Sequence, residues 1–511
     1  MAGRAEVHAV IRGSQLLGRL GGAQGEDGRL AGVEVVDLDA TAMIDRERST
    51  FGHDGPVTDL LEALRARLDD DCIQTDPDVV LAYAQDRAIF EHAGAAAVLV
   101  MPRSTAEVVA AVDAARAVGA PIVTRGAGSG LCGGANAVDG CVLLSLHRMN
   151  RVLDVDTTNR LARVQPGVLN GELKRVVAGH GLFYPPDPAS YEISSIGGNV
   201  ATNAGGLCCV RYGVTRDYVA GLEVVLASGE VIRTGRHTLK NTAGLDLTGV
   251  FVGSEGILGV ITEVTVRLIP TPPTPCTAIA YFADLPSAGR AIVDIFRAGH
   301  QPTLMEIVDR ASLRQVDAVY QMDLDTTAAC LLLIQTAGDD AEGSIAAIAG
   351  LCKAQGATEV YHVSDPAEGD MFIEVRRRVW PAFEQLGKAL LPEDVAVPRE
   401  RLPELLAGIV EIGERHRVAL PTIGHAGDGN MHPLLVFDGG DADEVARAQA
   451  AFGDIVALSL RLGGTIAAEH GVGTLKRRFL ELELDPVHHA VQRRIKATLD
   501  PDGLLNPGKA L

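Results

Sequence analysis

The sequence of 511 residues is poor in aromatic side chains: they make up 4% of it, and it has one tryptophan. It has no apolar run of the roughly 18–20 residues that a membrane-spanning helix needs. The first residues lack the basic and then apolar order of a secretory signal peptide, so we expect none. Together these absences favour a cytoplasmic protein.

Paired cysteines are also missing. None of the eight cysteines forms a C-x-x-C pair, which argues against an iron–sulfur cluster and a structural zinc module. Scattered cysteines in a long chain are typical of a reduced, cytosolic protein, where they pack as small apolar side chains.

Positive charge is in deficit as well. There are 46 Lys and Arg residues against 66 Asp and Glu residues, a net charge of −20. This balance argues against nucleic acid or an anionic membrane as the main partner. It leaves open a buried anionic substrate, because a site can be locally positive.

The length predicts about two to four domains, and 47% hydrophobic residues supply a large core. Residues 1–50 are rich in Gly, Ala, Asp and Arg with little apolar pattern, which predicts a poorly ordered extension. Met43 is an alternative start of the native chain.

From residue 94 onward, strand and helix patterns follow one another. Residues 97–102 predict a strand and 104–120 a helix, with capping-box spacing between Ser104 and Glu107 and a stop at Gly119. Further strands are predicted over 121–126, 141–146, 151–168 and 259–270.

"TPPTP", at residues 271–275, is a stiff break and the best domain boundary. The strand–helix units beyond it predict an α+β domain with an antiparallel sheet. The predicted divisions are an extension at 1–50, a cofactor domain at 51–272, a substrate or cap domain at 273–465 and a C-terminal segment at 466–511.

Three glycine-rich blocks occupy the first half of the chain. "TRGAGSGLCGGAN" (124–136) contains G-x-G-x-x-G, but the Rossmann fingerprint requires a helix to begin inside the motif, and here a strand follows. A non-helical glycine loop can still bind phosphate through bare backbone N–H groups. With "SSIGGNVATNAGG" (194–206) and "GSEGILG" (253–259), the blocks indicate a large cofactor threaded between loops.

"HAGDGNMHP" (425–433) places two histidines seven residues apart around a Gly-Asp-Gly-Asn turn. In a straight strand, residues seven apart face opposite ways. The turn can fold strand onto strand and bring both imidazoles to one point. By itself the stretch leaves open a metal site, a substrate contact and a structural role.

Residues 94–511 resemble the FAD-linked D-2-hydroxy acid dehydrogenases of the vanillyl-alcohol oxidase (PCMH-type) fold, a family with D-lactate dehydrogenase, the glycolate oxidase flavin subunit and D-2-hydroxyglutarate dehydrogenase. The matching stretches follow the family's order: "PRSTAEV", "RGAGSGLCGG", "PPDPAS", "SIGGNVATNAGG", "YGVTRDYVAGLEVV", "VGSEGILGVITE", "HAGDGNMH", "EHGVG" and "NPGK". The resemblance implies an α+β protein with a two-part PCMH-type FAD-binding domain and a cap domain built on a central antiparallel sheet.

The resemblance also implies FAD, bound non-covalently. Relatives with covalent flavin use a histidine just after the first glycine loop, and Ser129 stands at that position; we expect no covalent role for the nearby Cys132. The residues implied to line the FAD site are Arg125, Gly126, Ala127, Gly128, Ser129, Gly130, Asp187, Ser195, Gly197, Gly198, Asn199, Asn203, Glu255, Gly259, Ile261 and Asn506.

By the same resemblance, His425, His432 and Glu469 bind a divalent metal, Zn²⁺ or Mn²⁺, and His470 is the general base. Two imidazoles and a carboxylate leave room for a substrate oxygen. A histidine suits proton removal at neutral pH, and the flavin accepts the hydride. Arg376 aligns with the family's carboxylate-binding arginine, whereas we interpret Arg377 and Arg378 as a solvated helix face.

The predicted substrate is a small 2-hydroxy acid. D-2-hydroxyglutarate dehydrogenases carry a threonine and a lysine for a second carboxylate, where this chain has Trp380 and Pro392, with Lys388 out of register. This favours a monocarboxylate, D-lactate first, then glycolate or a longer acid. The alternatives are D-2-hydroxyglutarate, an FAD oxidase that uses O₂, and a non-catalytic flavin subunit.

The predicted electron acceptor is a quinone, a cytochrome or an electron-transfer flavoprotein, since the chain has no cluster of its own. Contact with such an acceptor is compatible with a peripheral position at a membrane. A homodimer is also compatible with the sequence.

Overall fold

The computed structural model describes residues 18–19, 34–35 and 56–511, and the chain divides into two units, Met1–Pro56 and Val57–Leu511. In the first unit, β1 (Gly18–Arg19) pairs antiparallel with β2 (Glu34–Val35). Apart from these four residues, the predicted extension of residues 1–50, with Met43, lies outside the described residues. The second unit contains the three larger sheets.

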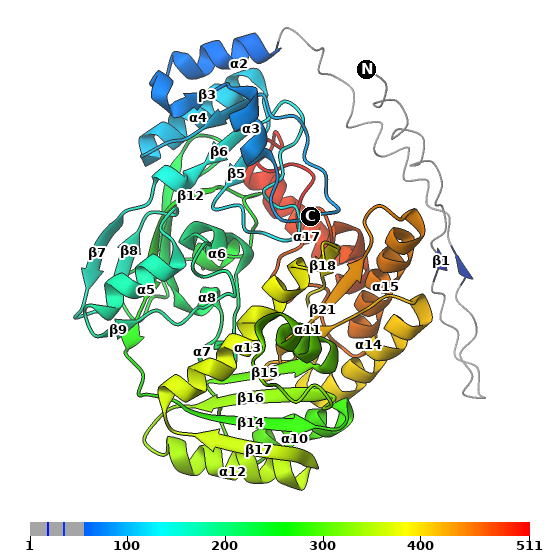
Figure 1. Ribbon diagram of the computed structural model, residues 1–511. Helices are drawn as coiled ribbons and strands as arrows, with labels where there is room; N and C mark the ends of the chain where they lie inside the picture. The colour runs from blue at the N-terminus through cyan, green and yellow to red at the C-terminus, as the bar shows by residue number, and fades with distance from the viewer. Residues whose placement is uncertain (1–17, 20–33, 36–55) are drawn as a thin grey trace. The chain divides into compact units, whose positions relative to one another are not determined.

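The first sheet of this unit has the order β3-β4-β6-β5, and its strands are Ile73–Gln74, Val98–Val100, Val142–Ser145 and Ile122–Arg125. β4, β6 and β5 are parallel, and β3 is antiparallel to β4. Around this sheet lie α2 (Pro56–Arg65), α3 (Pro77–Ala84) and α4 (Thr105–Val118) (Figure 1). As predicted, Ser104 caps α4 by accepting the Glu107 N–H, and Gly119 ends it in the left-handed conformation.

The second sheet is antiparallel, with the order β11-β10-β12-β8-β7. Its strands are Val231–Gly235, Val219–Val225, Val260–Arg267, Leu161–Val164 and Val152–Asp156. Its helices and a small strand pair are α5 (Asn170–Ala178), α6 (Ile196–Thr202), α7 (Cys209–Tyr212), α8 (Thr215–Tyr218), α9 (Leu247–Phe251), β9 (Leu182–Phe183) and β13 (Ile269–Pro270). The two sheets confirm the predicted two-part arrangement of the first half.

The third sheet is antiparallel throughout and has the order β17-β14-β16-β15-β20-β21-β18, with β19 also paired to β21. Its strands are Ala357–Val363, Cys276–Phe282, Cys330–Thr336, Leu304–Asp309, Thr422–His425, Asn430–Phe437, Ala389–Pro392 and Val395–Ala396. β14 follows directly after "TPPTP". The predicted α+β class with a central antiparallel sheet is confirmed, while the predicted domain limits stay predictions.

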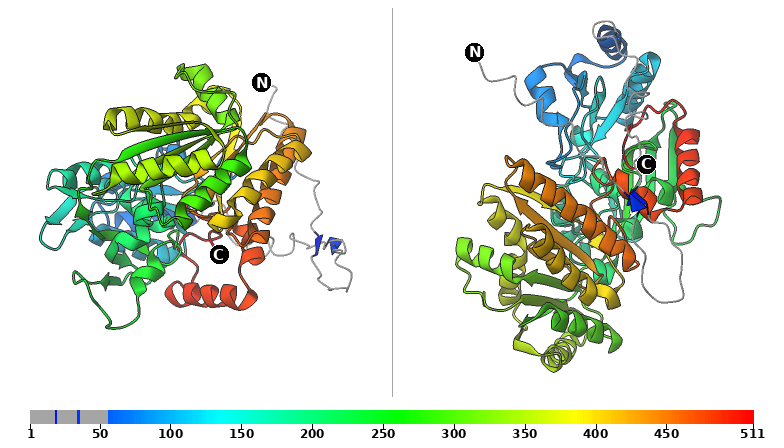
Figure 2. Two further views of the ribbon diagram at one scale, coloured as in Figure 1. Left: turned by 90° about the horizontal axis from the view of Figure 1, so that it is seen from below. Right: turned by 90° about the vertical axis from the view of Figure 1, so that its right-hand side faces the viewer.

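Helices cover both faces of this third sheet. One face packs on α10 (Leu285–Arg297), α12 (Ala341–Ala354), α14 (Leu402–His416) and α15 (Ala442–Arg461), and α14 and α15 run side by side (Figure 2). The other face packs on α11 (Arg310–Tyr320) and α13 (Pro366–Glu384). Successive residues of each strand therefore pack alternately into two hydrophobic layers, one on each face of the sheet.

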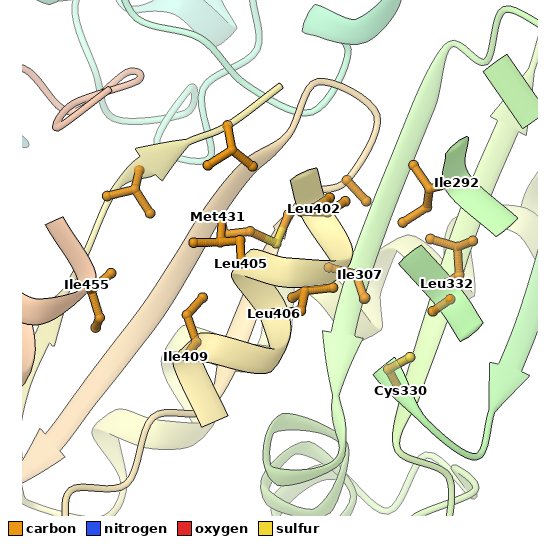
Figure 3. Packing of buried hydrophobic residues seen from close by; sticks show 14 of the residues in the cluster. Ile292, Ile307, Cys330, Leu332, Leu402, Leu405, Leu406, Ile409, Met431 and Ile455 are labelled. Carbon is orange, nitrogen blue, oxygen red and sulfur yellow. The ribbon is translucent and has the colours of Figure 1, made fainter. Parts of the chain in front are cut away.

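The first of these layers is a continuous aliphatic core. Leu405 of α14 lies beside Met431 of the sheet, and Leu406 lies beside Ile307 (Figure 3). Because side chains alternate along a strand, burying Met431 in this core turns His432, its neighbour, to the opposite face. The core thus sets the direction of the residues that build the site.

The chain ends with α16 (Leu480–Glu483) and α17 (Pro486–Leu499), followed by a turn-rich segment. That segment joins the first sheet: Ile122 N–H donates to the Leu504 carbonyl at 2.8 Å, and Asn506 N–H donates to the Ile122 carbonyl at 2.7 Å. No helix in the described part of the chain is both long enough and apolar enough to cross a membrane.

Candidate active site

A cavity of about 670 Å³ lies where the glycine-rich segments meet α13 and the third sheet. Its volume falls in the range of about 300–1,000 Å³ that is usual for cofactor sites. Of the predicted residues, its lining includes Gly126, Ala127, Gly128, Ser129, Gly130, Asp187, Ser195, Gly197, Gly198, Asn199, Glu255, Gly259, Ile261, Arg376, His425, His432, Glu469 and His470. Bare glycine backbone along one wall suits a large phosphate-bearing cofactor.

The first glycine loop contains no helix between β5 and β6, which confirms that it is not a Rossmann loop. Gly128 has φ +70°, and a Cβ there would lie 2.0 Å from Arg125 Nη2. Arg125 itself is buried beneath the loop, donates to the Gln85 carbonyl at 3.1 Å and does not line the cavity. Its guanidinium therefore packs against the backbone of Gly128 and supports the loop without lining the cavity.

The second glycine block is more regular than predicted: residues 196–202 form α6, so it is not simply a loop. Ser195 caps the helix by accepting the Gly198 N–H, and the Asn199 side chain is held by Asn170 and Ser194. Asn203 ends the helix in the left-handed conformation and lies outside the cavity lining, with its side chain accepting from Arg216 N–H. Asparagine tolerates that conformation, which explains its place there.

Glu255 and Asn506 tie separate segments together. The Glu255 carboxylate accepts the N–H groups of Val472 and Gly473, both at 2.8 Å. The Asn506 amide donates to the carbonyls of Gly134 and Glu255, at 3.0 and 2.7 Å, and Asn506 does not line the cavity. These bonds join the first glycine loop, the third block and the C-terminal segment.

Asp187 lines the cavity and accepts the Cys208 N–H at 3.1 Å. Burial raises the pKa of its carboxyl, although Lys174 nearby opposes that shift.

All eight cysteines of the chain, each within the described residues, are free thiols, and six are buried, as their spacing predicted.

The two histidines of "HAGDGNMHP" lie on a β-hairpin. β20 and β21 pair antiparallel around residues 426–429, with His425 opposite Asn430 and Ile423 opposite His432. Residues opposite each other and residues two apart share a face, so both imidazoles point to the same side. Gly429 has φ +85°, and a Cβ there would lie 2.1 Å from the Val397 carbonyl oxygen.

Glu469 completes a convergent set of donors. Its Oε1 lies 3.3 Å from His425 Nε2 and 3.3 Å from His432 Nε2. Donor atoms bonded to one zinc ion at about 2.0–2.1 Å are spaced about 3.3 Å apart at a tetrahedral centre, so the three residues fit a divalent cation. Burial alone would raise the pKa of Glu469, but His425 and His432 outweigh it and hold that pKa well below its usual value.

A buried glutamate, Glu306, connects His425 to Arg376. Glu306 lies opposite His425 in the sheet; its Oε1 accepts from His425 Nδ1 at 2.7 Å and its Oε2 from Arg376 Nε at 2.8 Å. Glu306 is 0% exposed and Arg376 7%. Burial opposes a charged imidazole, yet Glu306 and Glu469 raise the pKa of His425 well above its usual value.

His470 stands beside this set. Its ring stacks on that of His432, with centroids 5.0 Å apart and planes 11° from parallel, and its Nε2 lies 3.9 Å from Glu469 Oε1. Burial lowers the pKa of His470 to about 4, against the attraction of Asp394. The imidazole is therefore neutral near pH 7, the form that can accept a proton, and the same burial makes its protonated form less favourable.

The cavity is also lined by Arg376 and by four apolar side chains of α13 and the third sheet, which are Trp380, Pro392, Ile423 and Leu434. Arg377 and Arg378 are exposed and pair with Glu374, as interpreted from the sequence, although Arg377 also lines the cavity. Lys388 is exposed and lies outside the lining. The cavity thus combines apolar side chains with the buried guanidinium of Arg376.

Four residues of the site were missed in the sequence: Glu306, Glu393, Asp394 and Lys476. All are at most 1% exposed. A signal was present for two of them, since Glu393 and Asp394 directly follow an apolar strand, where an acidic pair is unusual. Glu306 and Lys476 had no distinguishing neighbours.

The chain matches two domain families and several known proteins. Residues 96–235 match the model of the FAD binding domain, and residues 271–510 match that of the C-terminal domain of FAD linked oxidases. Glycolate oxidase subunit GlcD of Bacillus subtilis (strain 168) is 40% identical over 413 residues, 80% of this chain and 88% of that protein. D-lactate dehydrogenase of Anaerostipes hadrus is 34% identical over 423 residues, 81% of this chain and 89% of that protein.

Solved structures share the fold at lower identity. p-Cresol methylhydroxylase with substrate bound has a TM-score of 0.75 at 20% identity, over 90% of this chain and 97% of that chain. 4-Ethylphenol oxidase from Gulosibacter chungangensis has a TM-score of 0.74 at 19% identity, over 90% and 97% of the two chains. The chain therefore belongs to the FAD-linked D-2-hydroxy acid dehydrogenase family, with its PCMH-type fold, and is an FAD-linked oxidoreductase.

Proposed function

We propose that this protein oxidises a short D-2-hydroxy acid to the 2-oxo acid with FAD and a divalent metal, Zn²⁺ or Mn²⁺. The observation that carries the proposal is the convergence of His425 Nε2, His432 Nε2 and Glu469 Oε1 within 4.8 Å of one another. These donors line the same cavity as the glycine loops. A metal-donor set beside a flavin site suits the oxidation of an alcohol that must lose a proton and a hydride together.

Each group has a distinct task. FAD, when bound, accepts the hydride from C2 of the substrate. A divalent cation held by His425, His432 and Glu469 would lower the pKa of the substrate hydroxyl. No side chain of the protein could accept the hydride, so the chain's own residues orient the substrate and move the proton.

His470 is the proposed general base. Its imidazole lines the cavity next to the metal-donor set and stacks on His432, which limits its rotation. It takes the proton from the substrate hydroxyl as the hydride leaves C2.

Arg376 is the proposed partner of the substrate carboxylate. Its Nε is held by Glu306, and within the described residues no other acceptor lies within hydrogen-bond distance of the guanidinium. A planar guanidinium with free N–H groups can hold a carboxylate through two hydrogen bonds.

The apolar side chains that line the cavity favour a monocarboxylate. Pro392 and Leu434 have no donor for a second carboxylate, and the Trp380 indole N–H already donates to Glu384 at 2.6 Å. D-lactate is therefore the first expectation. Glycolate is the second candidate, because relatives at 40% and 38% identity are named glycolate oxidase subunits.

Anaerobic reduction of the flavin by a panel of D- and L-2-hydroxy acids tests the substrate. Bleaching of the bound FAD by D-lactate, faster than by L-lactate or D-2-hydroxyglutarate, is the expected result. Faster bleaching by glycolate selects the second candidate. A flavin that no 2-hydroxy acid reduces would exclude the proposal.

The acceptor is tested separately. We expect the reduced enzyme to pass electrons to a quinone, a cytochrome or an electron-transfer flavoprotein. Stoichiometric hydrogen peroxide in air would instead favour the alternative, an oxidase that uses O₂.

A further inference from the structure

Asp394 lies between β18 and β19, at the junction of the hairpin and the loop that carries Glu469 and His470. It is 0% exposed, and its Oδ2 accepts three consecutive backbone N–H groups, from Ala468, Glu469 and His470, at 2.8, 2.9 and 2.8 Å. Successive N–H groups of this kind form an anion-binding concavity. Here the anion is the Asp394 carboxylate, and the concavity is formed by the backbone of residues 468–470, the loop that carries Glu469 and His470.

The other oxygen of Asp394 reaches the hairpin. Its Oδ1 accepts from the Asn430 amide at 2.9 Å, and Asn430 is the cross-strand partner of His425. The preceding residue contributes as well, because the Glu393 carbonyl lies 3.3 Å from His432 Nδ1. The dipeptide Glu393–Asp394 therefore contacts His432 directly, the backbone of Glu469, and Asn430, the residue opposite His425.

Lys476 holds this dipeptide in place. Its Nζ donates to the carbonyls of Asp394 at 2.7 Å and Ile466 at 2.6 Å, and it pairs with the Glu393 carboxylate. Lys476 is 1% exposed and Glu393 0%. Burying two carboxylates and an ammonium is costly unless the charges are paired and hydrogen-bonded. Here the Asp394 carboxylate accepts four N–H bonds and Glu393 Oε1 pairs with Lys476, whereas Glu393 Oε2 has no hydrogen-bond partner within the described residues.

We infer that Asp394 is the positioning residue of the metal centre: it holds Glu469 and His470 against the His425–His432 hairpin before the metal binds. The inference rests on the proposed metal role of His425, His432 and Glu469. Residues that orient metal ligands from outside the coordination sphere typically change metal affinity by about 10–100-fold when replaced.

Asp394→Asn tests this without changing volume. In one orientation the oxygen of the new amide faces the loop, and its NH₂ faces the NH₂ of Asn430. In the other orientation the NH₂ of the new amide faces the three N–H groups of the loop. Either orientation opposes donor to donor. We expect metal to bind about 10–100-fold more weakly, with FAD still bound at one equivalent.

A second variant and a control keep the test independent of folding. Asn430→Ala removes the link between Asp394 and the hairpin, together with the bond from the Asn430 amide to the Val395 carbonyl, and leaves the three N–H bonds to the loop in place. It should weaken metal binding in the same direction by a smaller factor. Asp309→Asn alters another buried carboxylate of this sheet, which accepts the N–H groups of Ser312 and Thr422 and has no hydrogen bond to the loop at 466–470. Its metal affinity should match that of the wild type.

The measurement is competition with a chromogenic chelator for Zn²⁺ and for Mn²⁺ on the FAD-loaded full chain, with FAD content from absorbance. Equal metal affinity in the wild type and Asp394→Asn overturns the inference, as does equal weakening in Asp309→Asn. A wild-type protein that binds no metal overturns the metal role in the proposed function, which is a distinguishable failure.

Discussion

Replacing Glu306 by glutamine is the sharpest test of how the site is held together. The carboxylate serves two partners, His425 Nδ1 at 2.7 Å and Arg376 Nε at 2.8 Å, both of which donate. A glutamine has one acceptor oxygen, so one of the two N–H groups must face an NH₂. The substitution also leaves the Arg376 guanidinium, 7% exposed, without its anion.

The magnitude follows from these contacts. Breaking a buried ion pair from one side costs about 3–5 kcal/mol in the free energy of unfolding. Loss of the bond that orients His425 should weaken metal binding about 10–100-fold, or about 1.4–2.7 kcal/mol. Glu263→Gln is a matched control, because Glu263 pairs with Arg163 at 3.6 Å and both side chains are partly exposed. Its cost should stay below about 1 kcal/mol.

Equilibrium denaturation of the metal-free, FAD-loaded protein gives the first quantity, and chelator competition gives the second. A Glu306→Gln protein as stable as the control variant, with wild-type metal affinity, would refute the argument that one carboxylate supports both groups. A loss of stability alone would restrict Glu306 to the Arg376 pair.

Four further outcomes are expected. His470→Ala should keep FAD and slow anaerobic flavin reduction by about 10²–10⁴-fold, whereas unchanged reduction would remove His470 from proton transfer. Arg376→Lys should lower kcat/KM for the hydroxy acid by about 10–100-fold, because a lysine cannot form the two-pronged contact; steady-state kinetics decide this. Verified metal removal by a chelator should abolish activity and Zn²⁺ or Mn²⁺ should restore it, and full activity of the stripped enzyme would contradict the metal role. Ile307→Ala, in the core beneath the sheet (Figure 3), should cost about 2–5 kcal/mol of unfolding free energy, and a value under 1 would mean that this core adjusts to the cavity.

Much of the fold was predictable from local pattern. Ser104 and Gly119 bracket α4 because capping chemistry acts within one turn of the helix. The strand β6 after the first glycine loop excluded a Rossmann helix by the same local logic. The block at 194–206 was less predictable: its glycines suggested a loop, but Ser195 and Asn203 cap a short helix there.

The sequence predicted the candidate site residues that stand in a motif and did not predict those that stand outside one. His425 and His432 flank a turn that can be recognised from its glycines, and Glu469 and His470 stand before two further glycine positions. Glu306 is an ordinary residue in an apolar strand, and its role follows only from lying opposite His425 in a neighbouring strand 119 residues away. Lys476 resembles any basic residue before Arg-Arg until the fold buries it.

The sequence by itself determined the kinds of chemistry present: glycine loops that admit a large cofactor, a hairpin with two imidazoles and a carboxylate–histidine pair. These follow from residue type and short spacing, because turns, caps and alternation depend on neighbouring residues. Only the tertiary structure decided which groups meet and which charges are buried, since strand pairing and domain packing join distant residues. Asp394, which binds three N–H groups of a loop more than seventy residues away, is the clearest case.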